Sequence, residues 1–378
     1  MRNLKCAIVL TTINKPILLD GYFENLKKFG HVDQVEVIVI PDKKTPSGVF
    51  DYCRSLNNAG FKTMCPTLEE QEEYLKKIGI KSHFIPFNSD NRRNIGFLMA
   101  LELKIDFIIS IDDDNYCKQG EDFFAEHSVV CHGLSNLETV NAEDQWFNIC
   151  SLLKLNPNQL VYPRGYPYYN RMKKSSNKFV NENHDVRLNA GLWLDQPDFD
   201  GLTWLASPVN AIDFKNKSIA LGKNTWSPIN TQNTGLGRDV IPCYYFVRMG
   251  YSIGGLVIDR YGDIFSGYFS QKCIKHFKHG IRIGTPVADH IRNSHNYLKD
   301  VTSELACIWT LEDILPWLQE VKLSGLNYVE TYESLSYALE DAVEEFSGFI
   351  WTDSTKGYFH QMGYCMRQWA LACKQIIG

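Results

Sequence analysis

The chain has 378 residues, of which 44% are hydrophobic and 13% aromatic, and its formal net charge is −5. This composition excludes an intrinsically disordered protein, and the length predicts either one large domain with an extension or two domains. The negative charge excludes a general attraction to nucleic acid or to anionic membranes.

The cysteines and the apolar runs indicate where the protein resides. Eleven cysteines occur without a CxxC pair or a zinc-finger spacing, and an odd number cannot pair completely within one chain. Free thiols are typical of a reducing compartment, so we expect a cytoplasmic protein. The apolar run at 6–10 is too short for a signal peptide. No apolar stretch approaches the roughly 18 residues of a membrane span, so none is expected.

The first third of the chain alternates between strand and helix patterns. A Thr67–Glu70 capping box opens one of the predicted helices, which continues to Lys77. Such alternation predicts a parallel sheet with helices on both faces. The predicted strands are 6–10, 35–40, 84–85 and 107–115, and the predicted helices are 17–29, 67–77 and 94–103.

The strand at 107–115 ends in three consecutive carboxylates, Asp112, Asp113 and Asp114. Ligands of α/β sheets collect at the carboxyl ends of the strands. Two carboxylates about 4 Å apart repel by roughly 4 kcal/mol at an effective dielectric constant of about 20, which favours a cation between them. Carboxylates together with substrate phosphates are typical ligands of Mg²⁺ and Mn²⁺, so the run indicates a nucleotide-diphosphate ligand. The alternative is a solvated turn that closes the strand.

The remainder of the chain has a different pattern. Between about residues 120 and 300 it reads as irregular loops rich in Gly, Pro, Asn and aromatic residues, which is typical of a substrate-binding half. After about residue 310 it becomes helical again. One stripe comprises Tyr332, Leu335, Leu339, Ala342, Val343 and Phe346, and Trp369 with Leu371 marks another. We expect both stripes to pack against the sheet domain.

Several blocks in residues 90–325 resemble one family, the reversibly glycosylated polypeptides, whose best-known activity is that of a UDP-arabinopyranose mutase. The blocks are Arg93–Phe97, Ile109–Asp114, Arg164–Pro167 with Arg171, Gly191–Asp200, Arg260–Tyr261 with Asp263, and Glu312–Pro316 with Lys322–Ser324. The resemblance implies an α/β fold of the GT-A type, a Rossmann-like mixed sheet flanked by helices. This catalytic domain would span residues 1–305, with a helical C-terminal extension at 306–378.

The resemblance also implies a UDP-sugar substrate and a Mn²⁺ or Mg²⁺ cofactor. Asp112 and Asp114 would lie on one side of an extended segment and reach the ribose and the metal, and His290 would complete the ligands of the metal. Asp113 would face the other way and is a candidate nucleotide contact. The remaining candidates are Arg93 for the nucleotide or diphosphate, and Thr11 and Asp42, at the ends of the first two strands, for uracil or ribose. Alternatively, Arg93 is an ordinary surface arginine without a binding role. His290 is alternatively a histidine that only makes local hydrogen bonds.

The family glycosylates an arginine that corresponds to Arg164, and Arg171 belongs to the same motif. A protonated guanidinium is no nucleophile, so a carboxylate must accept its proton, or the arginine acts as an electrostatic clamp on the diphosphate. Asp263, Asp198 and Asp200 are the candidate partners, with loop capping as the alternative for each. Trp193 could stack on a sugar, but its apolar neighbours favour a place in the core.

The chain departs from the family pattern at several positions near the expected sugar pocket. Asn115 stands where the family has Cys, Ala190 stands where it has His, and 230–233 replaces a Cys-Gly-Met-Asn segment. We therefore expect a UDP-sugar mutase with self-glycosylation, or alternatively a transferase to an external glycan, protein or modified nucleobase. A non-catalytic sugar-nucleotide-binding subunit is the third hypothesis. The family also implies assembly into homo-oligomers.

Overall fold

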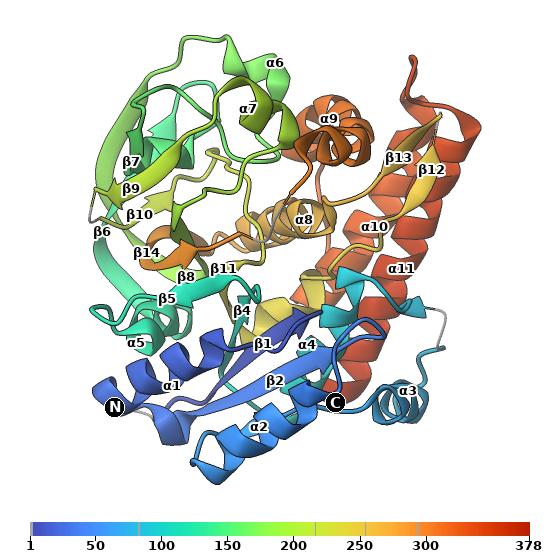
Figure 1. Ribbon diagram of the computed structural model, residues 1–378. Helices are drawn as coiled ribbons and strands as arrows, with labels where there is room; N and C mark the ends of the chain where they lie inside the picture. The colour runs from blue at the N-terminus through green and yellow to red at the C-terminus, as the bar shows by residue number, and fades with distance from the viewer. Residues whose placement is uncertain (1–2, 82–83, 216, 254, 293–294) are drawn as a thin grey trace.

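The computed structural model describes residues 3–81, 84–215, 217–253, 255–292 and 295–378. A mixed sheet of 12 strands crosses the molecule, and helices pack on it (Figure 1). Its strands are β1 (Cys6–Thr12), β2 (Val35–Pro41), β3 (Thr63–Met64), β4 (Phe107–Ile111), β5 (Asn115–Cys117), β6 (Gly133–Ala142), β7 (Leu153–Asn156), β8 (Asn177–Asp195), β9 (Asn210–Phe214), β10 (Ile219–Leu221), β11 (Asn233–Gly237) and β14 (Gly280–His290). A separate hairpin consists of β12 (Tyr251–Ile253) and β13 (Leu256–Ile258).

The helices lie on both faces of the sheet and along one end of the molecule (Figure 1). They are α1 (Leu18–Phe29), α2 (Gly48–Asn58), α3 (Leu68–Lys77), α4 (Arg93–Glu102), α5 (Phe123–Ser128), α6 (Tyr168–Arg171), α7 (Gly201–Ala206), α8 (Gly262–His276), α9 (Tyr297–Glu320), α10 (Tyr328–Glu345) and α11 (Asp353–Ile377). The predicted mixed α/β sheet flanked by helices, with a helical C-terminal extension, is confirmed.

The N-terminal part of the sheet has the predicted parallel arrangement, in the order β3-β2-β1-β4. Side chains of β1 alternate between two cores, because successive residues of a strand face opposite sides. Ala7 and Val9 join the core that contains α4, whereas Ile8 and Leu10 join the core that contains α1 and α2. The capping box at the start of α3 is present as predicted. The carboxyl ends of β1, β2 and β4 therefore meet at one edge.

The prediction of irregular loops between residues 120 and 300 is wrong, because this region contributes most of the remaining strands. β11 pairs antiparallel with β4, and the 19-residue strand β8 pairs with β11, β6 and β14. The first half of β8 is mostly exposed and its second half is buried, so no regular alternation marks it. The helix α8 is buried on most sides and shows no amphipathic stripe for the same reason.

Two smaller expectations also differ from the structure. Phe84 and Ile85 are buried but do not belong to a strand; they lie in the connection that leads to α4. The C-terminal helices begin at Tyr297, and α9 runs through the proposed boundary between 305 and 306. The division of the chain at that point stays a prediction.

The C-terminal helices pack on the rest of the molecule as expected. On α10, the side chains of Tyr332, Leu335, Leu339 and Val343 are fully buried. Trp369 of α11 is buried, and its indole Nε1 donates to the Ile241 carbonyl at 3.2 Å.

Leu371 is half-exposed, so the prediction that this residue packs inward is wrong. A helix turns about 100° per residue, which places Leu371 about 200° away from the buried side of Trp369. None of the helices in the described residues is both long enough and apolar enough to cross a membrane.

Candidate active site

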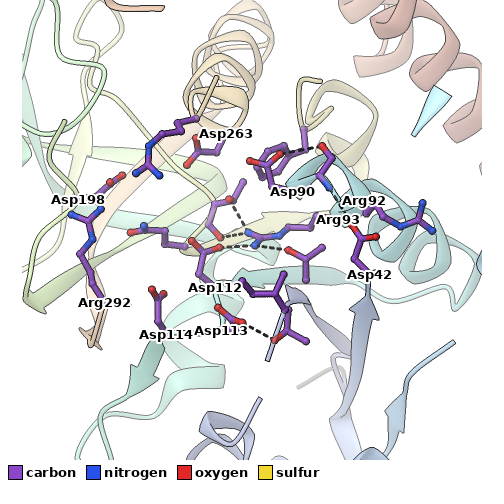
Figure 2. A pocket seen from close by; sticks show the side chains of 18 of the residues that line it. Asp42, Asp90, Arg92, Arg93, Asp112, Asp113, Asp114, Asp198, Asp263 and Arg292 are labelled. Carbon is purple, nitrogen blue, oxygen red and sulfur yellow. Dashed lines mark hydrogen bonds and ion pairs between the residues drawn. The ribbon is translucent and has the colours of Figure 1, made fainter. Parts of the chain in front are cut away.

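A cavity of about 360 Å³ opens where the carboxyl ends of β1, β2 and β4 meet (Figure 2). Thr11 of β1, Asp42 after β2 and the aspartates after β4 line one side. Side chains from the middle of the chain line the rest of the cavity, and the end of β14 lies next to Asp114. Its lining joins residues that the sequence analysis singled out: Thr11, Asp42, Arg93, Asp112, Asp113, Asp114, Arg164, Asp263 and His290.

The three aspartates form a turn and not the predicted extended segment. β4 ends at Ile111, and the Asn115 amide donates to the Asp112 carbonyl at 3.3 Å. All three carboxylates line the cavity, so the expected alternation, with Asp113 facing away, is wrong. Thr12 Oγ1 donates to Asp113 Oδ2 at 2.6 Å. A turn of three short acidic residues can present every side chain to the same space.

Each aspartate of the turn has a different electrostatic environment. Burial raises the pKa of Asp112, and the neighbouring Arg93 guanidinium only partly opposes the effect. Burial also raises the pKa of Asp113, against the hydrogen bond from Thr12. Burial would raise the pKa of Asp114 too, but hydrogen bonding and charge from His290 outweigh it, so that pKa is lowered. Asp114 is therefore the carboxylate held most firmly in its charged form.

His290 ends β14 and lies beside Asp114, with 3.5 Å between its Nε2 and Asp114 Oδ2. Its Nδ1 is buried and has no hydrogen-bond partner among the described residues. A carboxylate and an imidazole suit Mn²⁺, so these two donors fit the predicted cofactor. The described residues contain no group of three His, Cys, Asp or Glu side chains placed to hold a metal ion. The Asp112 carboxylate instead accepts a hydrogen bond from Arg93.

Arg93 is the first residue of α4 and lies under the floor of the cavity with 4% of its side chain exposed. Its Nη2 donates to Asp112 Oδ1 at 2.6 Å and to Thr11 Oγ1 at 3.1 Å. Its Nη1 donates to Thr231 Oγ1 at 2.8 Å and to Ser110 Oγ at 3.2 Å. Both terminal nitrogens are thus engaged within the protein, and Arg93 holds Asp112 in place.

Arg164 lies between two buried carboxylates, and together with Asn230 these residues form what we term the Arg164 cluster: Arg164, Asp198, Asp263 and Asn230. Its Nε and Nη2 each lie 2.9 Å from an oxygen of Asp198, and its Nη2 and Nη1 lie 2.7 and 3.0 Å from the two oxygens of Asp263. Nη1 also donates to the Arg260 carbonyl. All five N–H groups therefore have acceptors. Burial opposes the charge of Arg164, but the carboxylates outweigh it and raise its pKa further.

The backbone around the Arg164 cluster is shaped for these contacts. Gly165 has a φ of 86°, and a Cβ there would lie 2.5 Å from Cγ2 of Ile264. Arg260 has a φ of 63°, a left-handed conformation that costs a non-glycine residue free energy. Glu304 of α9 holds the Arg260 Nε at 2.9 Å. The strained residue thereby directs its carbonyl at Arg164.

Two predicted site residues lie elsewhere: the described lining of the cavity includes neither Arg171 nor Trp193. Arg171 Nη2 donates to Asp200 Oδ2 at 2.8 Å, and its guanidinium lies 3.6 Å from the centre of the Tyr168 ring. Asp200 caps α7 by accepting from the Thr203 amide at 2.7 Å, as its alternative interpretation expected. Trp193 is 3% exposed and lies in the core. The catalytic role predicted for Arg171 and the sugar contact predicted for Trp193 stay predictions, and neither residue is in the described lining of the cavity.

Some of the positions at which the chain departs from the family pattern lie at the cavity, and others do not. Asn115 is buried and its Nδ2 donates to Asp114 Oδ1 at 2.9 Å. Asn230 Nδ2 donates to Asp198 Oδ2 at 2.8 Å, and Gln232 lines the cavity. Ala190, in contrast, is a buried residue of β8 outside the cavity lining. Four of these positions, Asn115, Asn230, Thr231 and Gln232, thus touch the candidate site or its carboxylates.

Sequence reasoning missed some lining residues. Arg292, which follows β14, and Arg260 were not assigned roles in the site. Asp198 was only one of three candidate partners for Arg164, although it makes two of its contacts. A cue for Arg292 was its position two residues after His290. Its lack of a partner could not be seen in the sequence.

The chain is similar to a group of plant enzymes. The family model described as "Reversibly glycosylated polypeptide" matches residues 2–377. UDP-arabinopyranose mutase 2 of Arabidopsis thaliana is 25% identical over 303 residues, covering 79% of this chain and 76% of the relative. Probable UDP-arabinopyranose mutase 1 of Pisum sativum is 24% identical over 352 residues, covering 91% and 85%.

Solved structures with a similar arrangement are more distant. Glucosyl-3-phosphoglycerate synthase from Mycobacterium tuberculosis, in complex with Mn²⁺ and UDP-glucose, is 10% identical with a TM-score of 0.37, covering 82% of this chain and 79% of that one. S. aureus TarS, in complex with UDP-GlcNAc, is 10% identical with a TM-score of 0.39, covering 90% and 73%.

Proposed function

The chain belongs to the reversibly glycosylated polypeptide family, and on that premise we propose that it is a metal-dependent enzyme of the GT-A type that converts a UDP-sugar between pyranose and furanose forms. The observation that carries this proposal is the single cavity that joins Asp112, Asp113 and Asp114 with the Arg164 cluster. One side of the cavity offers carboxylates for a metal and a nucleotide, and the other offers fixed charges for a sugar. The relatives named as UDP-arabinopyranose mutases support the same reaction class.

The nucleotide would lie along the strand ends. Thr11 and Asp42 line the cavity there and would contact uracil or ribose. Asp114 and His290 would hold Mn²⁺ or Mg²⁺, with Asp112 next to them and the substrate diphosphate supplying further oxygen ligands. When bound, the metal ion would offset the negative charge that develops on the departing diphosphate.

The sugar would lie beside the Arg164 cluster. Cleavage of the bond between the anomeric carbon and the β-phosphate oxygen leaves the electron pair on UDP, and the sugar changes ring form before the bond to UDP is made again. If Arg164 carries the glycosyl group, a carbon–nitrogen bond forms as a proton passes to Asp198 or Asp263. Both carboxylates are in contact with its guanidinium, so either can accept that proton.

A transferase is the second candidate function. Gln232, within the 230–233 segment that departs from the family, lines the cavity, so the sugar pocket differs where an acceptor would enter. Asp263 would then act as general base towards a hydroxyl of a glycan, a protein or a modified nucleobase. The third hypothesis, a non-catalytic binding subunit, is disfavoured because the carboxylates and arginines of the cavity are all present.

One experiment separates these functions. The purified protein is incubated with Mn²⁺ and a panel of UDP-pentoses and UDP-hexoses, and the sugar nucleotides and the intact protein mass are followed together. We expect interconversion of pyranose and furanose forms. A glycosyl mass increment that disappears in Arg164→Lys would support the carrier role of Arg164, whereas turnover without an increment would leave Arg164 as a positioning residue.

Other outcomes favour the alternatives. Release of UDP only in the presence of an added acceptor would favour the transferase. Absence of any UDP-sugar binding, with or without metal, would refute both enzymatic functions.

We also propose that the protein works in the cytosol. All eleven cysteines are free thiols in the structure, which suits a reducing compartment. Assembly into homo-oligomers stays a prediction from the family.

A further inference from the structure

Most of the arginines that line the cavity are already neutralised by carboxylates of the protein. Arg93 pairs with Asp112, Arg164 pairs with Asp198 and Asp263, and Arg260 pairs with Glu304 and Asp300. Arg92 is fully buried and turns away from the cavity, towards Gln71 and Glu72 (Figure 2). These arginines help to shape the site, but their charges are already paired with groups of the protein.

Arg292 is the exception among the described arginines of the cavity. It follows β14 by two residues, and the intervening Ile291 amide donates to the Asp114 carbonyl at 3.0 Å. No hydrogen bond or ion pair joins its guanidinium to any described residue, and its Nη1 is buried without a partner. In Figure 2 the side chain extends from the β14 end towards Asp198, beside the space in front of Asp114.

The guanidinium of Arg292 lies against two aromatic rings. Its guanidinium lies 5.5 Å from the centre of the Trp204 ring and 5.9 Å from that of Tyr297. These two rings stack on each other with 5.4 Å between their centres and an angle of 11° between their planes. A cation held against aromatic faces loses little rotational freedom when it binds a ligand. The site therefore presents a guanidinium that contacts two aromatic rings and whose Nη1 has no hydrogen-bond partner among the described residues.

A buried guanidinium nitrogen without an acceptor is costly unless a ligand supplies one. The planar fork of arginine matches two oxygens of a phosphate group. Arg292 lies on the same side of the cavity as Asp114 and His290, where the proposed function places the metal and the diphosphate. The ligand that fits this position is an oxyanion.

We propose that Arg292 binds the diphosphate of the UDP-sugar and stabilises it as it departs. Arg93, which the sequence suggested for that task, acts instead by positioning Asp112. This inference rests on the proposed function, since it takes the diphosphate from the UDP-sugar of that proposal.

The test is binding of uridine, UMP and UDP, each with Mn²⁺, measured by isothermal titration calorimetry. In Arg292→Gln we expect the affinity for UDP to fall by about 10- to 100-fold, the range for a lost hydrogen bond to a charged group. The affinity for uridine should not change, and Arg292→Lys should recover part of the loss. Lys15→Gln is the matched control, because it removes one positive charge from an exposed lysine close to Ile13 that is absent from the described lining of the cavity.

The outcomes distinguish the inference from the function on which it rests. Unchanged UDP affinity in Arg292→Gln, with normal binding by the wild type, would overturn the inference and leave the function standing. An equal loss in Lys15→Gln would also overturn it, by showing a general effect of positive charge. Failure of the wild type to bind UDP would instead refute the proposed function.

Discussion

The Arg164 cluster and the segment that follows β14 face the same cavity but use their charged groups in opposite ways. Arg164 donates to five acceptors, all supplied by the protein. Arg292 has no hydrogen-bonded partner among the described residues, and His290 keeps a buried Nδ1 without one. A fully paired ion maintains the shape of a site, whereas an unpaired one is available to a ligand. We therefore expect substitutions in the Arg164 cluster to affect stability most, and substitutions in the segment after β14 to affect UDP binding most.

Removal of Arg164 should have the largest effect and offers the most direct way to break the comparison. The Arg164, Asp198 and Asp263 side chains are only 7, 4 and 8% exposed. Arg164→Met would leave two buried carboxylates without a cation, so we expect the free energy of unfolding to fall by about 3–5 kcal/mol. Urea unfolding measures the change.

The control for that substitution is Arg54→Met, which removes an exposed ion pair with Asp51. Its free energy of unfolding should stay close to that of the wild type. Similar losses in the two variants would show that the Arg164 cluster does not hold the fold together.

The second prediction concerns binding at the β14 side. Asp114→Asn removes the charge that faces His290, so we expect the enhancement of UDP affinity by Mn²⁺ to fall on the order of 100-fold. Removing the metal with EDTA from the wild type should give the same weak affinity. Titration calorimetry in the presence and absence of Mn²⁺ makes the measurement.

Asp195→Asn is the matched control, because Asp195 ends β8 opposite His290 in the strand register but does not line the cavity in the described structure. It should retain the Mn²⁺ enhancement. If Mn²⁺ enhances the UDP affinity of Asp114→Asn as much as that of the wild type, Asp114 is not a ligand of the metal.

A third prediction concerns the pH dependence of stability, which tests whether the charge of Asp198 is paired with that of Arg164. Burial would raise the pKa of Asp198, but Arg164 outweighs it and lowers that pKa from 3.8 to about 2. Asp198 therefore stabilises the fold fully above its unfolded-state pKa of 3.8, and this contribution is lost as the pH falls towards 2. The contribution is about 2 kcal/mol.

The measurement is the difference in free energy of unfolding between the wild type and Asp198→Asn. We expect the difference to shrink by about 2 kcal/mol between about pH 5 and pH 2. A difference that is the same at both pH values would mean that Arg164 does not stabilise the charged form of Asp198.

The smallest effect is expected at Trp193, which belongs to neither region. Its indole Nε1 is buried without a partner among the described residues, so Trp193→Phe removes an unsatisfied donor along with some packing. We expect the free energy of unfolding to change by less than about 1.5 kcal/mol and UDP affinity to stay the same. Trp193→Ala should cost about 3–5 kcal/mol. Weaker UDP binding by Trp193→Phe would instead indicate that Trp193 contributes to nucleotide binding.

The N-terminal part of the fold could be predicted because its signals are local. The apolar strands β1 and β2, the amphipathic helix between them and the Thr67–Glu70 capping box each depend on residues a few positions apart. The position of Asp112, Asp113 and Asp114 at a strand end follows from the same kind of signal. Their arrangement in a turn does not, because it depends on the contacts of each side chain.

The middle of the chain could not be predicted in this way. β8 pairs with strands that lie before and after it in sequence, and one half of it is exposed while the other is buried. α8 is surrounded by other elements, so no face of it is polar enough to mark it as a helix. Burial on all sides removes the periodicity on which sequence reasoning depends.

By itself, the sequence determined the class of fold, the acidic strand end and the family resemblance, because composition and short-range pattern carry that information. Only the tertiary structure decided which charges are paired. Asp198 and Asp263 lie 34 and 99 residues from Arg164 along the chain and neutralise it, whereas the Nη1 of Arg292 has no hydrogen-bond partner among the described residues. The energy of an ion depends on the groups that surround it in space, and these are brought together only when the chain folds.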